Sequence, residues 1–142
     1  MNAYQKQLVQ RSFHHIVPIA DQFANLFYGR LFELDPALRA LFNGDMDQQG
    51  LKLTTTLQIA LSSLDDFDKI VPALQKMGRS HAEYGVQAAH YDTVGSALLW
   101  ALEQALGEAF TAETEQAWIS VYSLLADTMK HAANESIELF EK

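Results

Sequence analysis

Five histidines are the side chains of this sequence best suited to binding a metal or moving protons, because the chain has no cysteine. The lack of cysteine excludes disulfide bonds, thiolate metal sites and cysteine nucleophiles. His14 and His15 are adjacent, so on a helix they point to different sides and cannot share one metal ion. We expect structural or surface roles for these two residues and for His131, near the end of the last helix. His90, beside Tyr91, is interpreted as a loop residue that could touch the edge of a cofactor.

His81 differs from the other histidines because it lies on an apolar helical stripe. Ile70, Leu74, Met77 and His81 follow at i, i+4, i+7 and i+11, which places them on one helix face toward the core. A histidine in this position either bonds a backbone carbonyl or binds a metal, and its spacing alone favours the first role. The sequence has none of the usual enzyme motifs, such as a phosphate-binding glycine loop, HExxH, GxSxG or a calcium loop.

Composition limits the class of protein. The chain has 142 residues, so we expect one domain over residues 1–142, and 49% of the residues are apolar. A net charge of −8 leaves no basic stripe for nucleic acid or for an anionic membrane. No apolar run has the length of a signal peptide or a membrane span, which predicts a cytoplasmic protein.

Helices are the elements that must position these side chains, because only seven Gly and three Pro interrupt the apolar periodicity. The predicted segments are Tyr4–Val17, Ile19–Leu34, a short turn at Ala37–Phe42, Asp47–Ser63, a helix through Ile70–His81, Asp92–Leu106, and a long helix from Thr111 through Met129. The predicted breaks are at Pro18, which moves Val17 away from the helical region, at Asp35-Pro36, at Asn43-Gly44-Asp45, at an Asp65-Asp66 cap, at Gly85 and at Gly107. This pattern predicts an all-α fold of six to eight helices.

The order of several short segments around His81 is similar to that of the globins, specifically bacterial single-domain haemoglobins and the haem domains of flavohaemoglobins. The segment at His81 also resembles neuroglobins. The resemblance covers nearly the whole chain and implies a globin fold around one haem pocket. The segments that carry it are Phe27-Tyr28-Gly29-Arg30-Leu31-Phe32, Pro36 with Leu41-Phe42, Gln49 to Leu53, Gly78-Arg79-Ser80-His81 with Tyr84-Gly85-Val86, Ala88 to Gly95, and Ala117-Trp118 with Tyr122.

On the proximal side, the resemblance assigns His81 as the ligand of a b-type haem iron. The other ring nitrogen of His81 is then expected to donate to a carbonyl about one turn earlier or to the hydroxyl of Ser80. Phe42 matches the phenylalanine that packs on the haem ring, and Lys52 could reach a propionate or stay solvated. The further residues expected to contact the cofactor are Val86, Tyr91 and Val94.

On the distal side, Tyr28 and Gln49 match hydrogen-bond donors to a bound gas. Gln49 and Leu53 are one helical turn apart, so both can face the iron, with Leu53 shaping the space. Two donors imply tightly held oxygen. The alternatives are a buried Tyr28 bonded to a carbonyl and an exposed Gln49.

Two positions depart from the flavohaemoglobin pattern. A glutamate of the last helix, which with the tyrosine matching Tyr91 makes the proximal histidine more electron-donating, falls here on Ala133, and Glu135 should point elsewhere. Ser80 replaces a lysine before His81. The chain ends at Lys142 without flavin and nicotinamide domains, so redox turnover is expected to need a separate reductase.

The resemblance therefore implies reversible binding of O₂, NO and CO with high oxygen affinity. It also implies a possible enzymatic role as a nitric oxide dioxygenase, with Tyr28 and Gln49 as the residues that polarise oxygen. Oxygen transport is an alternative use of the same site. The other two hypotheses are a gas or redox sensor that acts through a partner protein, and a haem-free helical interaction module in which His81 is a core residue.

Overall fold

The structure, a computed structural model, describes residues 2–42 and 44–141, with side-chain surroundings up to residue 134. These residues form six α-helices and four short 3₁₀ helices, without a strand, so the all-α prediction is confirmed. The elements are α1 (Ala3–Ile16), η1 (Val17–Ile19), α2 (Ala20–Leu34), η2 (Pro36–Leu41), α3 (Met46–Ser62), η3 (Leu64–Asp66), α4 (Phe67–Glu83), α5 (Ala88–Leu106), η4 (Gly107–Ala109) and α6 (Ala112–Glu141). Over the described part of the chain, no helix is both long and apolar enough to cross a membrane.

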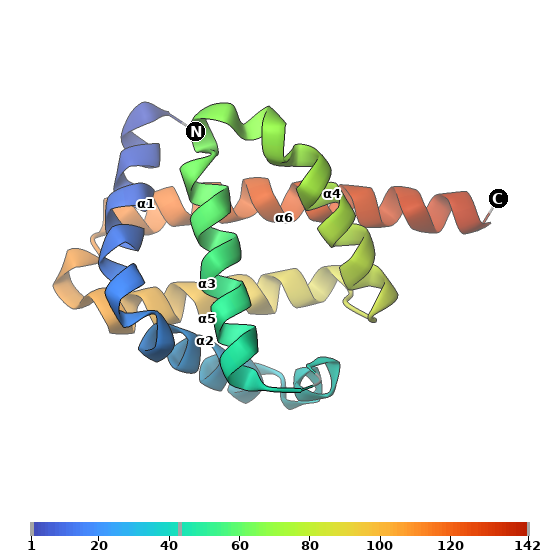
Figure 1. Cartoon of the computed structure of the whole chain (residues 1–142), viewed down its shortest axis with the longest axis horizontal. Coiled ribbons are helices and arrows are strands. Elements are labelled where there is room, and N and C mark those ends of the chain that lie inside the picture. Colours follow the sequence, from blue (N-terminus) through green and yellow to red (C-terminus); the bar gives the residue numbers. More distant parts are fainter. Residues whose placement is uncertain (1, 43, 142) are drawn as a thin grey trace.

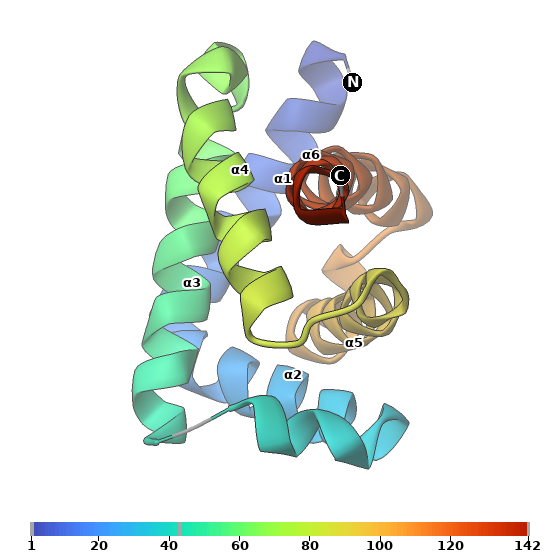
Figure 2. The ribbon, with the colours of Figure 1, turned by 90° about the vertical axis from the view of Figure 1, so that its right-hand side faces the viewer.

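The helices cross one another in two groups. α5 and α6 run along the long axis of the molecule, and α3 and α4 cross over them (Figure 1). The closest packing joins α4 to α6, α2 to α5, α1 to α6 and α3 to α2. In the end-on view, α3 and α4 stand on one side of α5 and α6, while α2 closes the bottom (Figure 2). The two crossing helices therefore pack on different partners: α3 packs mainly on α2, and α4 packs mainly on α6.

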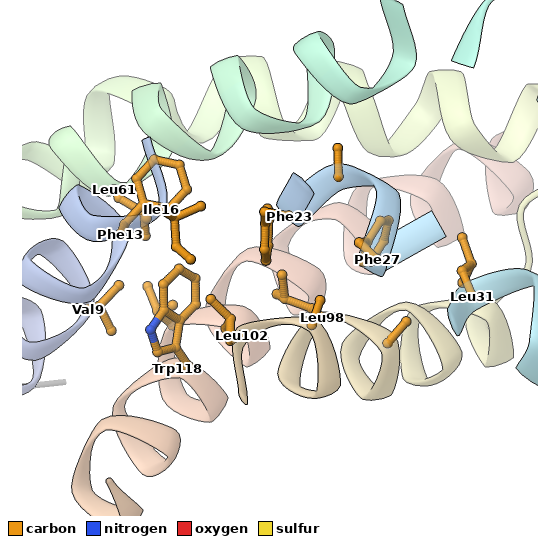
Figure 3. Close-up of a cluster of buried hydrophobic side chains, with 14 of the residues drawn as sticks. Val9, Phe13, Ile16, Phe23, Phe27, Leu31, Leu61, Leu98, Leu102 and Trp118 are labelled. Atoms are coloured by element: carbon orange, nitrogen blue, oxygen red, sulfur yellow. The ribbon is translucent and has the colours of Figure 1, made fainter. Parts of the chain in front are cut away.

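The main core lies among α1, α2, α5 and α6. Trp118 is 1% exposed, and its indole N–H donates to the hydroxyl of Ser12 at 2.8 Å, a bond that joins α6 to α1. Phe13 packs against the same indole with ring centroids 6.3 Å apart. Figure 3 shows Trp118 near Val9 at one end of the cluster and Leu31 at the other. A second, smaller cluster of Ala60, Leu74 and Leu125 lies under α4.

Several predicted helix ends are confirmed. α2 ends at Leu34, and the carboxylate of Asp35 accepts from the Ala37 N–H at 3.2 Å. Asp45 accepts from the Asp47 N–H at 2.8 Å and starts α3. Gly85 and Gly107 have φ of 99° and 58°, a region that favours glycine, and each follows a helix. Asn43, part of a predicted turn, lies outside the described residues.

Two predictions about the first half of the chain were wrong in their local chemistry. Val17 has φ −50° and ψ −47°, which is right-handed helical, so the break before α2 comes from a 3₁₀ turn and not from an extended Val17. Pro18 is tolerated there because the first turn of a helix needs no N–H partner at that position. Neither Asp65 nor Asp66 caps α4 with its side chain. They form ion pairs with Lys6 at 3.5 Å and with Lys69 at 3.8 Å.

The start of α5 was also predicted too late. The helix begins at Ala88 and not at Asp92, because Gln87 and His90 form a reciprocal cap. The Nδ1 atom of His90 accepts from the Gln87 N–H at 2.9 Å, so His90 belongs to the first helical turn and not to a loop. Histidine is an unusual third residue for this cap, where Glu or Gln is typical, so the pattern was easy to miss. His131 is exposed, as predicted, but well before the end of α6 at Glu141.

At Gly78 the backbones of α4 and α6 approach each other closely. A Cβ atom added to Gly78 would overlap the backbone of Met129. Because backbone atoms cannot move aside as a flexible side chain can, any larger residue at position 78 must push α4 away from α6.

We expect Gly78→Ala to lower the free energy of unfolding by about 1–3 kcal/mol, the usual cost of overpacking. The measurement is urea unfolding followed by circular dichroism. The matched control is Gly29→Ala in α2, where an added Cβ has nothing within 4 Å. That change should be neutral or stabilising, since alanine favours helix over glycine by about 1 kcal/mol. Equal effects at the two positions would contradict this account of the α4–α6 contact.

Candidate functional site

His81 lies near the end of α4, and its ring is held by the backbone. Its Nδ1 atom is 2.8 Å from the carbonyl oxygen of Met77, one turn earlier. A carbonyl can only accept a hydrogen bond, so Nδ1 carries a proton, and in the neutral imidazole Nε2 then has the free lone pair. The carbonyl expected from the sequence is thus the partner, and Ser80 is not. This tautomer is the one that binds a metal through Nε2.

His81 belongs to no cluster of metal-binding side chains among the described residues. Among the described residues, no three His, Asp or Glu side chains lie close enough to hold an ion together. A metal bound by His81 must therefore bring most of its own ligands, as iron in a porphyrin does. The half-buried position of His81 leaves the ring within reach of such a group.

Tyr28, on α2, is buried and bridges to α3. Its hydroxyl donates to the backbone carbonyl of Gln49 at 3.3 Å, beyond the usual length for such a bond. This is the carbonyl-bonded arrangement considered as an alternative for Tyr28. Burial raises the pKa of Tyr28 to about 12, so the phenol is a neutral donor near pH 7. The side chain of Gln49 is half-buried rather than exposed.

An aromatic cluster surrounds Tyr28. The Phe42 ring meets Tyr28 edge-on, with centroids 5.4 Å apart, and lies 5.6 Å from Phe32. The Asp35 cap and the following 3₁₀ helix place Phe42 there, since this residue ends η2. The cluster supplies rigid apolar surface beside the Tyr28 hydroxyl. Phe32 belongs to this cluster, although the sequence analysis gave it no role beyond its place in a segment that resembles globins.

The other expected contact residues lie on α3 and α5 or just before α5. Leu53 and Val94 are half-buried and pack against the main core. Lys52, one residue before Leu53, is exposed, which suits either a rim contact or a solvated lysine. Val86 and Tyr91 line a cavity on the His81 side of the fold, described next.

A cavity of about 390 Å³ opens between the end of α4, the start of α5 and α6. Tyr91 is 8% exposed, and its hydroxyl is buried without a hydrogen-bond partner among the described residues. Its backbone is fixed, because the Tyr122 hydroxyl donates to the Tyr91 carbonyl at 2.6 Å. Burial raises the pKa of the Tyr91 phenol, which keeps it a donor.

Ala133 lines this cavity, so the position expected to hold a glutamate in flavohaemoglobins contributes no carboxylate. The side chain of Glu135 lies outside the described residues. Lys130 and Asn134 also line the cavity, and the sequence analysis missed both. Their spacing was the available signal, because Lys130, Ala133 and Asn134 stand at i, i+3 and i+4, positions that share one helix face.

The described residues fit a haem group. One imidazole with a free Nε2 comes from α4, while a neutral hydroxyl donor and the aromatic wall come from α2 and η2. Among the described residues, α3 and α4 are not one of the closely packed helix pairs, and the small cluster of Ala60, Leu74 and Leu125 joins them to α6. Such an arrangement can hold a flat apolar group between a metal ligand and a hydrogen-bond donor.

Comparisons with known sequences agree with this reading. The sequence model described as Globin matches residues 25–129. Neuroglobin of Danio rerio is 34% identical over 118 residues, which cover 73% of this chain and 74% of that protein. A flavohemoprotein of Chromobacterium violaceum is 33% identical over 120 residues, or 80% of this chain, and the match spans 30% of that protein's length.

Solved structures share the fold. An engineered carbene transferase made from RmaNOD, a candidate nitric oxide dioxygenase of Rhodothermus marinus, superposes with a TM-score of 0.89 at 28% identity, covering 100% of this chain and 99% of that one. A hexacoordinated heme protein from an anhydrobiotic tardigrade has a TM-score of 0.85 at 18% identity, covering 94% and 96% of the two chains. The second likeness concerns the fold alone. The fold that the sequence predicted is confirmed.

The buried hydroxyl of Tyr28 makes the free energy of unfolding depend on pH above about pH 10. Its pKa rises from 10.0, its ordinary value, to about 12 in the folded chain. Below pH 10 the phenol is protonated in both states, whereas above pH 10 the unfolded chain loses this proton first. We expect the free energy of unfolding to fall between pH 10 and about 12, with Tyr28 contributing on the order of 2 kcal/mol.

Urea unfolding at a series of alkaline pH values measures this effect. Tyr28→Phe should show a shallower loss of stability than the wild type. Tyr84→Phe is the matched control, because Tyr84 is 75% exposed. Identical pH slopes for Tyr28→Phe and the wild type would show that Tyr28 is not the group responsible.

Proposed function

The chain belongs to the globin family, and we propose that it binds a b-type haem through His81 and a diatomic gas on the Tyr28 side. One observation carries the proposal: the 2.8 Å hydrogen bond from His81 Nδ1 to the Met77 carbonyl leaves Nε2 free as a metal ligand. The b-type haem is the part of the proposal that the resemblance to globins implies, and the absence of cysteine excludes only the thioether links of c-type haem.

When bound, haem supplies an iron that takes O₂, NO or CO and that supports the oxidation of nitric oxide to nitrate by oxygen. The first role of the protein residues is to hold the haem. Phe42 offers a flat aromatic surface, while Leu53 and Val94 add aliphatic walls from α3 and α5. Lys52, exposed on α3, would meet an acidic group at the rim.

The second role, donating a hydrogen bond to the gas, belongs to Tyr28. Its hydroxyl is a neutral donor, because burial raises the pKa of the phenol to about 12. Its bond to the Gln49 carbonyl is long, at 3.3 Å, so little is lost when the hydroxyl turns to a gas ligand. The Gln49 side chain is a second donor from α3. Two donors beside the gas favour slow release and therefore high oxygen affinity.

Nitric oxide dioxygenation is the chemistry that we favour for this site, with oxygen binding or transport as the simpler use of it. The 28% identity with RmaNOD and the 33% identity with a flavohemoprotein support the enzymatic version. A separate electron-donating reductase and a cytoplasmic location, both predicted from the sequence, belong to the same proposal. Tyr28 and Gln49 would then orient and polarise oxygen, and His81 would anchor the cofactor.

The haem part is tested by absorption spectra of the purified protein, first ferric, then reduced, then with oxygen and with carbon monoxide. The wild type should show a Soret band that shifts with each gas, and His81→Ala should lose the normal ferrous spectrum, because it removes the metal ligand. His15→Ala is the matched control, since His15 is exposed on α1. If the wild type takes up no haem when haem is supplied, the proposal is wrong, and the alternative of a haem-free helical interaction module is supported.

The distal part is tested by stopped-flow measurement of oxygen dissociation. Tyr28→Phe removes only the hydroxyl and should speed release by about tenfold or more, the usual effect of losing a strong hydrogen bond. The exposed Tyr84→Phe should release oxygen at the wild-type rate. An unchanged rate in Tyr28→Phe would take this residue out of the mechanism.

A further inference from the structure

The guanidinium of Arg39, next to the aromatic cluster around Tyr28, makes contacts that the proposed function does not use. Arg39 belongs to η2, which packs beside the end of α2 at the bottom of the end-on view (Figure 2). The residue is exposed and forms no ion pair with any described residue, whereas Arg30 on α2 pairs with Glu33 at 3.2 Å. The charge of Arg39 therefore meets groups other than a carboxylate.

Arg39 binds both backbone polar groups of Phe42. Its own carbonyl accepts a hydrogen bond from the Phe42 N–H at 3.2 Å, and its Nη1 atom donates to the Phe42 carbonyl at 3.0 Å. Phe42 directly follows η2 and has an extended backbone, with φ −106° and ψ 109°. Its carbonyl therefore lies beyond the hydrogen bonds of the helix, and the Arg39 side chain supplies the bond that restrains it.

The same guanidinium also lies over the Phe32 ring. Its central carbon, Cζ, is 5.7 Å from the centre of that ring, within the range of a cation–π interaction. The Phe32 ring in turn contacts Phe42, with centroids 5.6 Å apart, and stacks on Tyr28, with centroids 6.0 Å apart and planes at 29°. Arg39 thus holds one ring by its backbone and a second by its face, and both rings contact Tyr28.

The position of the Tyr28 hydroxyl depends on these rings because its hydrogen bond is weak. Among the described residues its partner is the Gln49 carbonyl, at 3.3 Å. The packing of the phenol ring therefore decides where the hydroxyl points. We propose that Arg39 is a positioning residue for the gas site, which holds the aromatic cluster in the arrangement that directs the Tyr28 hydroxyl. This inference rests on the proposed gas-binding function and adds to it a residue that need not touch the haem or the gas.

The test compares two substitutions in the haem-loaded protein. Arg39→Met removes the charge and the donor, whereas Arg39→Lys keeps the charge but loses the planar guanidinium. In stopped-flow measurements we expect Arg39→Met to release oxygen about two- to fivefold faster than the wild type, the effect of losing one exposed cation–π contact. Arg39→Lys should lie between the two. Arg11→Met is the matched control, because Arg11 is an exposed arginine on α1, and it should release oxygen at the wild-type rate.

Two further measurements separate positioning from a general loss of stability. The C–O stretching band of the reduced, CO-saturated protein responds to a hydrogen bond donated to the gas. In Arg39→Met this band should move toward its position in Tyr28→Phe. When Tyr28→Phe is already present, adding Arg39→Met should not speed oxygen release further, because both residues act through one hydroxyl.

A third measurement does not require haem. The purified protein is labelled with ¹³C at the tyrosine Cζ atoms and titrated with alkali in an NMR experiment, with Tyr28→Phe identifying the Tyr28 signal. Burial raises the pKa of Tyr28 to about 12, and a loosened cluster admits water, so the Tyr28 pKa should be lower in Arg39→Met than in the wild type. The loss of a nearby cation would by itself raise this pKa, so the direction of the change separates packing from charge.

Three results would overturn the proposal. The first is an Arg39→Met protein with unchanged oxygen release and an unchanged C–O stretching band. The second is an equal effect of Arg39→Met with and without the Tyr28 hydroxyl, which would mean that Arg39 acts on the haem itself. The third is a Tyr28 pKa that rises or stays constant in Arg39→Met. A wild type that binds no haem contradicts the proposed function, and the Tyr28 titration then still decides whether Arg39 holds the aromatic cluster.

Discussion

The contact between α4 and α6 at Gly78 is the constraint on which the position of His81 depends. α4 has only two buried residues, Leu74 and Gly78, and it packs mainly on α6. Because Gly78 has no side chain, the backbone of α4 lies close to the backbone of α6 at Met129. Gly78 lies about one turn before His81 on α4. Met77, next to Gly78, provides the carbonyl that fixes the His81 ring. A single glycine therefore sets both the position of the helix and, through its neighbour, the orientation of the imidazole.

The two sides of the candidate site pack against buried clusters of different size. Tyr28, on the distal side, belongs to the main core, which joins α1, α2, α5 and α6 through large side chains such as Trp118 and Phe23. α4, on the proximal side, rests on the small separate cluster around Leu74 and Leu125. Local stability follows buried apolar contact, so α4 should open at lower free energy than α2. The hydroxyl donor is thus held more firmly than the metal ligand.

Burial keeps the phenols of Tyr28, Tyr91 and Tyr122 neutral, and nearby Tyr91 and Asp92 add to this effect at Tyr122. The pKa values of Tyr28, Tyr91 and Tyr122 all lie above the ordinary value, with desolvation as the first cause in each case. These groups therefore act as donors over the physiological range. Tyr122 uses its hydroxyl to fix the Tyr91 backbone and Tyr28 bonds Gln49, while Tyr91 alone of the three has a hydroxyl without a partner among the described residues.

The sequence by itself determined the helical fold, most helix ends and the special position of His81. Apolar spacing is a local property, and Asp35, Asp45, Gly85 and Gly107 act on residues beside them in the chain, so a linear pattern is enough to find them. The resemblance to globins then supplied Tyr28 and Phe42, which spacing alone treats as core residues.

Only the tertiary structure decided which partners these side chains meet. The Asp65-Asp66 pair forms ion pairs and not a cap, because Lys6 comes from α1, far away in sequence. The bond between Tyr28 and Gln49 joins two helices, and Lys130 lies over the Tyr91 ring because α6 packs beside α5. Such contacts depend on how helices pack in three dimensions, a property that a one-dimensional pattern of residue types does not contain.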